Sequence, residues 1–456
     1  MTCHLPYDRE GATIRIGGMV RRSRSFQGGA YLPVDRLRPV GEPIPDLPPA
    51  AKLVVPLLQH DGEAAEPVVE VGQLIEAGQL IGKATGPTSM NVHAPAAGTV
   101  TAITRAATAA RTDGPAVAIE TSQDVTQTED KADRLSSLAP TDAAQLAEIA
   151  DHAGITDFRR PGSGLGDQLR LVITSGVGDI IINGLPHEPL VTAGRELLRQ
   201  HVGTVLATAM RLRDALHAER LWIAVDKSDR NLINHCRQAA HGHAVRVAAL
   251  ANKYPQAAPV LLAWAVTGRQ TPIGRQPEET GVLVLEVEPL LALAEAARTH
   301  RPMTHRVVNV VGPAVARPGL YRIPVGTSFT DVLRHAGLAR SVARIIEGGP
   351  LTGVAVETPD AVVTKQTAAI LVMNHEHERV PVPGPCIRCG WCQDACPVGL
   401  DPQMLLNAAE RDDSALARSL QPGACLACGL CSYVCPAELP LSQAAIRWKE
   451  HAAHNV

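Results

Sequence analysis

The middle third of the chain alternates between two hydrophobic patterns. Residues 142–155 and 193–216 carry apolar side chains at the spacing of an amphipathic helix. The runs "DIIING" (179–184) and "RLWIAVD" (220–226) are instead short and apolar, which is typical of buried strands. Strands separated by helices predict a mostly parallel sheet. We therefore expect a Rossmann-like α/β domain in this part of the chain.

Ligands of such sheets bind beyond the carboxyl ends of the strands. Three polar loops follow predicted strands: "NGLPHEP" (183–189), "VDKSDRN" (225–231) and "ANKYPQ" (251–256). They are the candidate ligand loops of the α/β domain.

Residues 51–105 alternate short apolar runs with glycine turns, which predicts a small β-barrel or sandwich. "VGQLIEAGQLIG" (71–82) followed by "VHAPAAGTV" (92–100) resembles the barrel-sandwich hybrid of lipoyl and biotinyl carriers. In those carriers the modified lysine lies on an exposed hairpin between the two halves. Here the interval holds only Lys83, directly after a strand, which favours an unmodified structural barrel over a swinging-arm carrier.

Residues 305–338 contain two β-like runs, a Pro-Gly turn and a helix with a candidate N-cap at Ser328 or Thr330. Further strand-like runs follow at "RIIEGGPLTGVAV" (344–356) and "AAILVM" (368–373). This order predicts a small β-grasp module of the SLBB-like kind.

Eight of the ten cysteines lie in two copies of one spacing, C-x2-C-x2-C-x3-C-P. Three thiolates at this spacing wrap one [4Fe–4S] cluster, while the fourth, followed by proline, ligates the other cluster. The ligand sets are therefore expected to be crossed: Cys386, Cys389, Cys392 with Cys435 for cluster 1, and Cys425, Cys428, Cys431 with Cys396 for cluster 2. The carboxyl-terminal region is predicted to be a bacterial-ferredoxin-like domain with two [4Fe–4S] clusters.

A zinc ribbon and a disulfide scaffold are the alternatives for these cysteines. Structural zinc sites usually use two separated C-x2-C pairs. Disulfides require an oxidising compartment, but the start "MTCHLPYDRE" lacks the apolar core of a signal peptide, which favours a reducing cytoplasm. Cys3 and Cys236 stand alone and are interpreted as inert thiols.

The amino-acid composition argues against a nucleic-acid partner and against a membrane-spanning segment. The net charge of −3 and the 3% aromatic content predict no nucleic-acid partner. The basic run at 21–25 is interpreted as a solvated or docking edge. The longest apolar stretches, 258–266 and 281–297, are too short or too interrupted by Glu to cross a bilayer.

The domain order and several motifs resemble the C subunit of the Rnf (Rsx) electron-transport complex over nearly the whole chain. The matching motifs are "GGAYLPVDR" (28–36), "HAPAAGTV" (93–100), "IINGLPHEP" (181–189), "YPQ" (254–256), "TGRQTP" (267–272), "GGPLTGVAV" (348–356), "CIRCGWCQDACPVGLDP" (386–402) and "CLACGLCSYVCPAELPL" (425–441). The resemblance implies a peripheral subunit on the cytoplasmic side of the bacterial inner membrane. Electrons from NADH would pass through FMN to the clusters and on to ferredoxin, coupled to ion translocation. The partners implied are an iron–sulfur B-type subunit and integral-membrane subunits, within an oxidoreductase of the translocase class.

The predicted domains follow from these patterns and from the resemblance. They are an N-terminal β domain with the barrel-sandwich hybrid (1–125), a linker (126–140), an α/β domain of FMN/NADH type (141–300), the β-grasp module (301–375) and the cluster domain (376–456).

The flavin loop departs from the family pattern. Family members carry a loop of the type G-I-V-G-x-G-G-A-x-F-P-T, whereas this chain reads "GITDFRRPGSGLGDQLRL" (154–171). Gly162, Gly164 and Gly166 still leave backbone N–H groups for a phosphate, with Arg159 and Arg160 as side-chain donors.

The family motif "NGAECEP" has likewise become "NGLPHEP". It keeps Asn183 and Glu188, the residues expected to face the isoalloxazine or the nicotinamide, and places His187 where a Cys stood.

Three functions stay open at this point. The first is the Rnf-type subunit with FMN as cofactor and NADH as substrate. The second is a soluble flavin iron–sulfur protein similar to the cobalamin reductase of propanediol-utilising microcompartments. The third is a flavin-free electron wire or docking subunit, which the altered loop favours over a fully active first.

Overall fold

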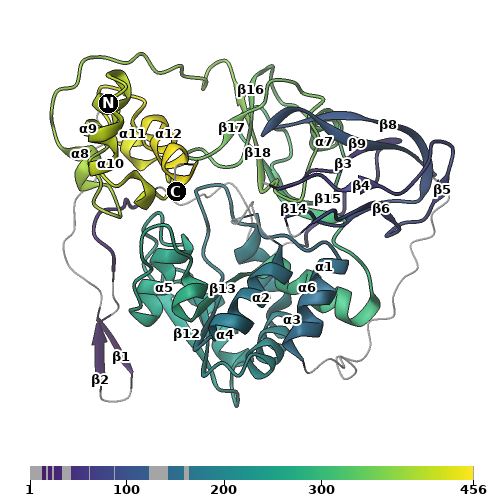
Figure 1. The fold of residues 1–456 in the computed structure, drawn as a ribbon, viewed down its shortest axis with the longest axis horizontal. Helices are drawn as coiled ribbons and strands as arrows, with labels where there is room; N and C mark the ends of the chain where they lie inside the picture. Colours follow the sequence, from purple (N-terminus) through teal and green to yellow (C-terminus); the bar gives the residue numbers. More distant parts are fainter. Residues whose placement is uncertain are drawn as a thin grey trace.

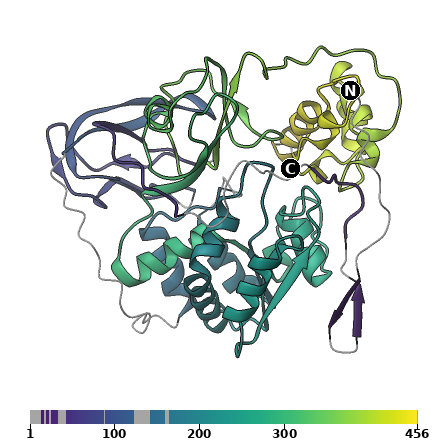
Figure 2. The same cartoon turned by 180° about the vertical axis from the view of Figure 1, so that it is seen from behind.

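A computed structural model describes residues 13–16, 19–22, 25–32, 43–60, 62–86, 88–122, 142–158 and 164–454. Figures 1 and 2 show the barrel and the β-grasp module side by side, the α/β domain beneath them, and the cluster domain at the other end. The prediction of a multidomain α/β protein with these four units is confirmed. The predicted linker 126–140 lies outside the described residues, and the domain boundaries stay a prediction.

The amino-terminal β domain consists of two small sheets. One sheet has the order β3-β9-β8-β5 and the other β4-β6-β7. Their bounds are β3 Lys52–Pro56, β4 Glu66–Pro67, β5 Leu74–Ile75, β6 Leu80–Lys83, β7 Val92–His93, β8 Gly98–Thr108 and β9 Arg111–Thr121. Leu53, Ile81 and Ile119 are fully buried in the shared core. A Cβ on Gly82 would lie 2.6 Å from Leu57, so the sheets pack this closely only with glycine there.

A separate two-stranded hairpin precedes the barrel. It consists of β1 Thr13–Ile16 and β2 Met19–Arg22, and it extends away from the four domains in Figure 1. The docking role predicted for residues 21–25 stays a prediction, since residues 23 and 24 lie outside the described part.

The α/β domain is built on a parallel sheet of order β12-β11-β10-β13, as predicted. Its strands are β10 Asp179–Asn183, β11 Arg220–Asp226, β12 Val245–Leu250 and β13 Val282–Glu286. Its helices are α1 Ala143–His152, α2 Leu165–Ser175, α3 Ala193–Ala215, α4 Arg230–Ala239, α5 Pro259–Thr267, η1 Pro277–Thr280 and α6 Val287–Thr299. Every residue of β10 and β13 is buried, which explains their unbroken apolar runs.

The β-grasp module has the sheet order β15-β14-β18-β16-β17 with α7 packed against it. The elements are β14 His305–Val311, β15 Gly319–Pro324, α7 Phe329–Ala336, β16 Val342–Glu347, β17 Val354–Ala355 and β18 Ala369–Asn374. Ser328 is the N-cap of α7, and its hydroxyl accepts the Asp331 N–H at 3.1 Å. The predicted cap is thereby confirmed at Ser328.

The cluster domain repeats one arrangement twice. The first copy leads into α8 Trp391–Asp394 and α9 Pro402–Glu410, and the second into α11 Leu430–Tyr433 and α12 Leu441–His454, with α10 Ser414–Ser419 and η2 Pro422–Ala424 between them. The buried Trp448 of α12 donates its indole N–H to the Leu405 carbonyl of α9 at 3.2 Å. The two copies therefore share one core.

A buried lysine joins three of the domains. Lys365 of the β-grasp module donates to the carbonyl of Gly154 in the α/β domain at 2.7 Å and to that of Asn91 in the barrel at 3.3 Å. Burial lowers its pKa to about 7. These contacts fix the α/β domain against the barrel next to the altered loop.

Candidate functional site

The two cysteine motifs follow the same backbone path. Arg388 and Gly390 have φ angles of 55° and 80° in the first motif, and Ala427 and Gly429 have φ angles of 53° and 75° in the second. Left-handed residues next to right-handed ones turn successive N–H groups toward the inside of a loop, where anions are favoured. Both loops are therefore shaped for an anionic group held by thiolates.

The thiols of the two motifs interleave. Burial raises the pKa of three cysteines of the second motif, and the charge of Cys396 from the first motif adds to the rise in each: Cys425, Cys428 and Cys431. Burial also raises the pKa of Cys392, and the charge of Cys435 contributes to it. The fourth cysteine of each motif thus lies near cysteines of the other, which supports the crossed ligand sets.

The thiols also have the surroundings that cluster ligands need. Burial raises the pKa of Cys428 to about 12, so this thiol stays protonated at neutral pH until a metal replaces the proton. The N–H of Leu400 donates to Cys396 Sγ at 3.3 Å, and that of Ala427 to Cys425 Sγ at 3.4 Å. N–H donors to sulfur are a normal feature of iron–sulfur sites.

The arrangement of the cysteine thiols fits [4Fe–4S] clusters. A cubane takes its four thiolates at the corners of a larger body. Crossed thiols, inward N–H groups and N–H···S bonds fit two [4Fe–4S] clusters.

The two motifs differ in exposure. Cys386 and Cys389 are exposed, and the apolar side chains beside them, Ile387 and Trp391, are 66% and 55% exposed. Leu430, which opens α11 as Trp391 opens α8, is fully buried. The first motif therefore faces solvent, while the second faces the rest of the protein.

A buried polar cluster lies where the strand order of the α/β sheet reverses. β10 and β13 are neighbours there, and their last residues, Asn183 and Glu286, are paired in register. The Asn183 amide donates to Glu286 Oε1 at 2.8 Å and to the Ala257 carbonyl at 3.1 Å. His187 Nε2 lies 2.9 Å from Glu286 Oε2. Asn183 is thus hydrogen-bonded inside the protein, and it contacts Glu286, which in turn contacts His187.

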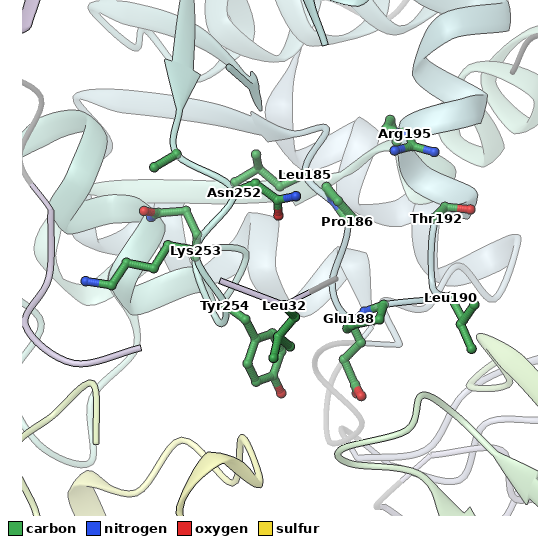
Figure 3. A pocket seen from close by; sticks show the side chains of 13 residues that line it. Leu32, Leu185, Pro186, Glu188, Leu190, Thr192, Arg195, Asn252, Lys253 and Tyr254 are labelled. Atoms are coloured by element: carbon green, nitrogen blue, oxygen red, sulfur yellow. The ribbon is translucent and has the colours of Figure 1, made fainter. Parts of the chain in front are cut away.

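An open pocket lies beside this cluster, beyond the ends of β10 and β12 (Figure 3). The space inside it is about 50 Å³, whereas pockets that enclose a cofactor usually have roughly 300 Å³ or more. Its walls carry two cations, two amides, a carboxylate and a tyrosine among apolar residues: Arg195, Lys253, Asn252, Gln256, Glu188, Tyr254, Leu32, Leu185, Pro186, Pro189, Leu190, Thr192 and Ala251.

The pocket contains one unsatisfied donor. Gln256 is buried, and its Nε2 has no hydrogen-bond partner. Together with the two cations, this donor fits an anionic ring-bearing group such as FMN, with part of that group in the open mouth.

Glu188 forms the border between the pocket and the β-grasp module. Its carboxylate accepts the N–H of Leu351 at 2.8 Å and the hydroxyl of Thr352. In Figure 3, Glu188 and Tyr254 point toward the same side of the pocket. The sequence predicted Glu188 as a ligand residue; the structure shows that it also holds the β-grasp loop in place.

The glycines of the altered loop are only partly described. Gly162 lies outside the described residues, as do Arg159 and Arg160. Gly164 caps α2, and its N–H donates to Asp167 Oδ2 at 3.3 Å. A Cβ on Gly166 would lie 2.8 Å from the backbone carbonyl oxygen of Ala147, so glycine is needed there for α1 and α2 to pack. The phosphate role of these glycines stays a prediction.

The pocket connects directly to the second cysteine motif. Tyr254, a pocket residue, donates its hydroxyl to the Cys428 carbonyl at 2.7 Å. The segment 26–30 runs from the pocket to Cys396: Ala30 pairs with Tyr254, and a Cβ on Gly28 would lie 2.5 Å from the Cys396 carbonyl oxygen. Sequence reasoning missed this connection, because no local pattern joins residues so far apart.

A larger groove of about 600 Å³ lies elsewhere, between α3, α6 and the start of the β-grasp module. Arg298, Arg301 and Arg322 line it together with His201 and His305. It does not lie at the carboxyl ends of the strands, so it is separate from the crevice described above.

Two further expectations concern single residues and membrane insertion. Cys236 is buried, and burial raises its pKa to about 12, which agrees with the prediction of an inert thiol; Cys3 lies outside the described residues. Among the described residues, no helix combines the length and apolar character needed to cross a membrane.

Family models match four parts of the chain. Residues 24–124 match the RnfC barrel sandwich hybrid domain, residues 168–295 the Nuo51 FMN-binding domain, residues 307–358 the NQRA C-terminal domain, and residues 384–439 a 4Fe-4S dicluster domain.

Curated relatives match over most of the chain. The C subunit of the ion-translocating oxidoreductase complex of Rhodobacter capsulatus is 31% identical over 84% of this chain and 74% of its own length. The protein of the same name in Pseudomonas aeruginosa is 31% identical over 84% of this chain, which spans about half (50%) of that longer relative. The C subunit of the proton-translocating ferredoxin:NAD(+) oxidoreductase complex of Clostridium ljungdahlii is 28% identical over 85% of both chains.

Among solved structures, an NAD+-reducing [NiFe]-hydrogenase in the air-oxidised state aligns with a TM-score of 0.46. It is 18% identical and covers 68% of this chain and 54% of its own.

Proposed function

The chain belongs to the family of C subunits of ion-translocating oxidoreductase complexes, and from this membership we propose that it is the peripheral electron-transfer subunit of an Rnf-type complex. Electrons pass between NADH, FMN and two [4Fe–4S] clusters toward ferredoxin, coupled to ion translocation. The observation that carries this proposal is the hydrogen bond from Tyr254 in the pocket to the Cys428 carbonyl, which brings the pocket next to a cluster ligand.

The pocket is the proposed place of FMN and of NADH oxidation. When bound, FMN accepts a hydride from NADH and passes on its electrons singly. Arg195 and Lys253 supply positive charge for its phosphate, and Gln256 Nε2 supplies a free donor. Glu188 closes the side of the pocket toward the β-grasp module.

The exposure of the motifs gives the proposed order of the two clusters. Tyr254 of the pocket bonds to the second motif, and segment 26–30 beside the pocket contacts Cys396, the expected fourth ligand of the same cluster, so cluster 2 is nearest to the flavin. Cys386 and Cys389 of cluster 1 are exposed, so cluster 1 exchanges electrons with a partner. The partner that fits is an iron–sulfur B-type subunit, which holds this chain on the cytoplasmic side of the inner membrane beside integral-membrane subunits.

A second candidate function is supported by the altered loop. The N–H groups of Gly164 and Leu165 are already bonded to Asp167 and Ile155, and the space of about 50 Å³ inside the open pocket is small for a flavin. Both observations favour a flavin-free electron wire, in which another subunit feeds the clusters.

One preparation tests both functions. The chain is purified anaerobically, iron, acid-labile sulfide and flavin are quantified, and the cluster absorbance is followed after NADH is added with and without FMN. About eight irons with bound FMN and NADH-driven bleaching support the first function. Clusters without flavin or bleaching support the electron wire, and protein containing zinc but no iron refutes both.

A further inference from the structure

Two side chains from outside the cysteine loops bond to the backbone of the second motif. Tyr254 reaches the Cys428 carbonyl, and Lys449 of α12 donates from Nζ to the Cys425 carbonyl at 2.9 Å. Lys449 is placed there by its neighbour Trp448, which is 5% exposed and bonded to α9. The ammonium group is therefore held at the second cysteine loop by the core of the domain.

The charge of Lys449 acts on the sulfur atoms of this loop. Its Nζ bonds to the backbone of Cys425, one of the expected ligands of cluster 2. An ammonium this close to a cluster ligand stabilises the extra negative charge that a cluster gains on reduction.

The first motif is followed by a residue of opposite charge at the corresponding sequence position. Lys449 follows Cys425 by 24 residues, and at the same separation from Cys386 the chain has Glu410. The two motifs, otherwise repeated, thus differ in charge at this aligned position.

Partial burial gives this cation its effect. The cysteines of the second motif are half-buried, which disfavours the more negative reduced cluster. A nearby ammonium offsets that penalty without exposing the cluster.

Resting on the proposed function, in which this loop binds cluster 2, we propose that Lys449 is a positioning residue that raises the reduction potential of cluster 2 through its charge. Cluster 2 is thereby kept reducible by the pocket beside it, although its ligand loop is partly shielded from water.

The test is an EPR-monitored redox titration of the anaerobically purified full chain. Lys449→Met removes the charge and the hydrogen bond, Lys449→Gln removes only the charge, and Lys449→Arg keeps the charge. Arg447→Met is the matched control, because Arg447 lies on the same helix, with a side chain 56% exposed, and pairs with Asp412 at 3.9 Å.

The Met and Gln variants should lower one of the two midpoint potentials by at least about 59 mV. For one electron, this shift is a tenfold change in the redox equilibrium constant. The other midpoint should not move, and the Arg and Arg447 variants should match wild type. A Cys389→Ser variant, which damages cluster 1, identifies the cluster that shifts.

Three results overturn the inference: unchanged midpoints in both charge-removing variants, a shift in the cluster that Cys389→Ser removes, or an equal shift with Lys449→Arg. If wild-type protein contains no iron, the proposed function itself fails, and this is visible before any variant is compared.

Discussion

The hydroxyl of Tyr254 lies 2.7 Å from the backbone carbonyl of Cys428, so one residue is both a wall of the α/β pocket and a bonded neighbour of a cluster ligand. The two residues are far apart in sequence and belong to different domains. This contact brings the second cysteine motif beside the pocket.

Replacing Tyr254 by Phe should slow NADH-driven reduction of the clusters while leaving the iron content unchanged. The loss of one hydrogen bond costs about 1 kcal/mol and frees the Cys428 loop from the pocket. Stopped-flow absorbance measures the rate in FMN-loaded protein. Tyr321→Phe is the control, since Tyr321 donates to the Arg317 carbonyl at 2.7 Å, inside the β-grasp module. Equal rates in both variants would refute a role of this contact in electron transfer.

The crossed ligand sets predict which cysteine variants should lose the same cluster. Cys396→Ser should damage the same cluster as Cys428→Ser, although the two cysteines belong to different motifs, because Cys396 lies with the second set. EPR spectra of the dithionite-reduced variants make the comparison, with Cys389→Ser as the contrasting variant. If Cys396→Ser matches Cys389→Ser, each motif binds its own cluster and the crossed assignment is wrong.

Trp391 should contribute to docking of the electron-transfer partner. Its side chain is 55% exposed beside Cys389, and an exposed aromatic residue of this kind is typical of an interface anchor. Trp391→Ser should lower electron transfer to the partner subunits several-fold, with both cluster signals intact. The control is Ile173→Ser, an apolar residue of α2 that is 43% exposed in another domain. Loss of a cluster signal in Trp391→Ser would indicate a structural role instead.

Lys365 should make the free energy of unfolding depend on pH above pH 7. Burial lowers its pKa from 10.5 to about 7, so between these values the unfolded chain binds more protons and a rise in pH favours folding. The contribution is at most about 1.4 kcal/mol per pH unit. Thermal unfolding between pH 7 and 9 should show a more positive slope for wild type than for Lys365→Met. Lys83→Met, at an exposed lysine, should keep the wild-type slope.

Local patterns were sufficient for the elements and for the cluster ligands. A cluster motif places three ligands within one loop, so its spacing is visible in sequence. Likewise, the buried strands β10 and β13 show their unbroken apolar runs directly, and Ser328 could be identified as a helix cap from its position alone. The sequence by itself therefore determined the four domain types and the chemistry of the cysteines.

Tertiary structure decided how these parts connect. Asn183, Glu286 and His187 meet because β10 and β13 become neighbours in the sheet, and Tyr254 and Lys449 reach the second cysteine loop from a different domain and a later helix. The same packing leaves all four cysteines of the second motif half-buried but Cys386 and Cys389 of the first exposed, although the spacing of the two motifs is identical. Contacts between distant residues depend on which faces pack together, and a repeated motif in the sequence contains no information about which copy will be covered.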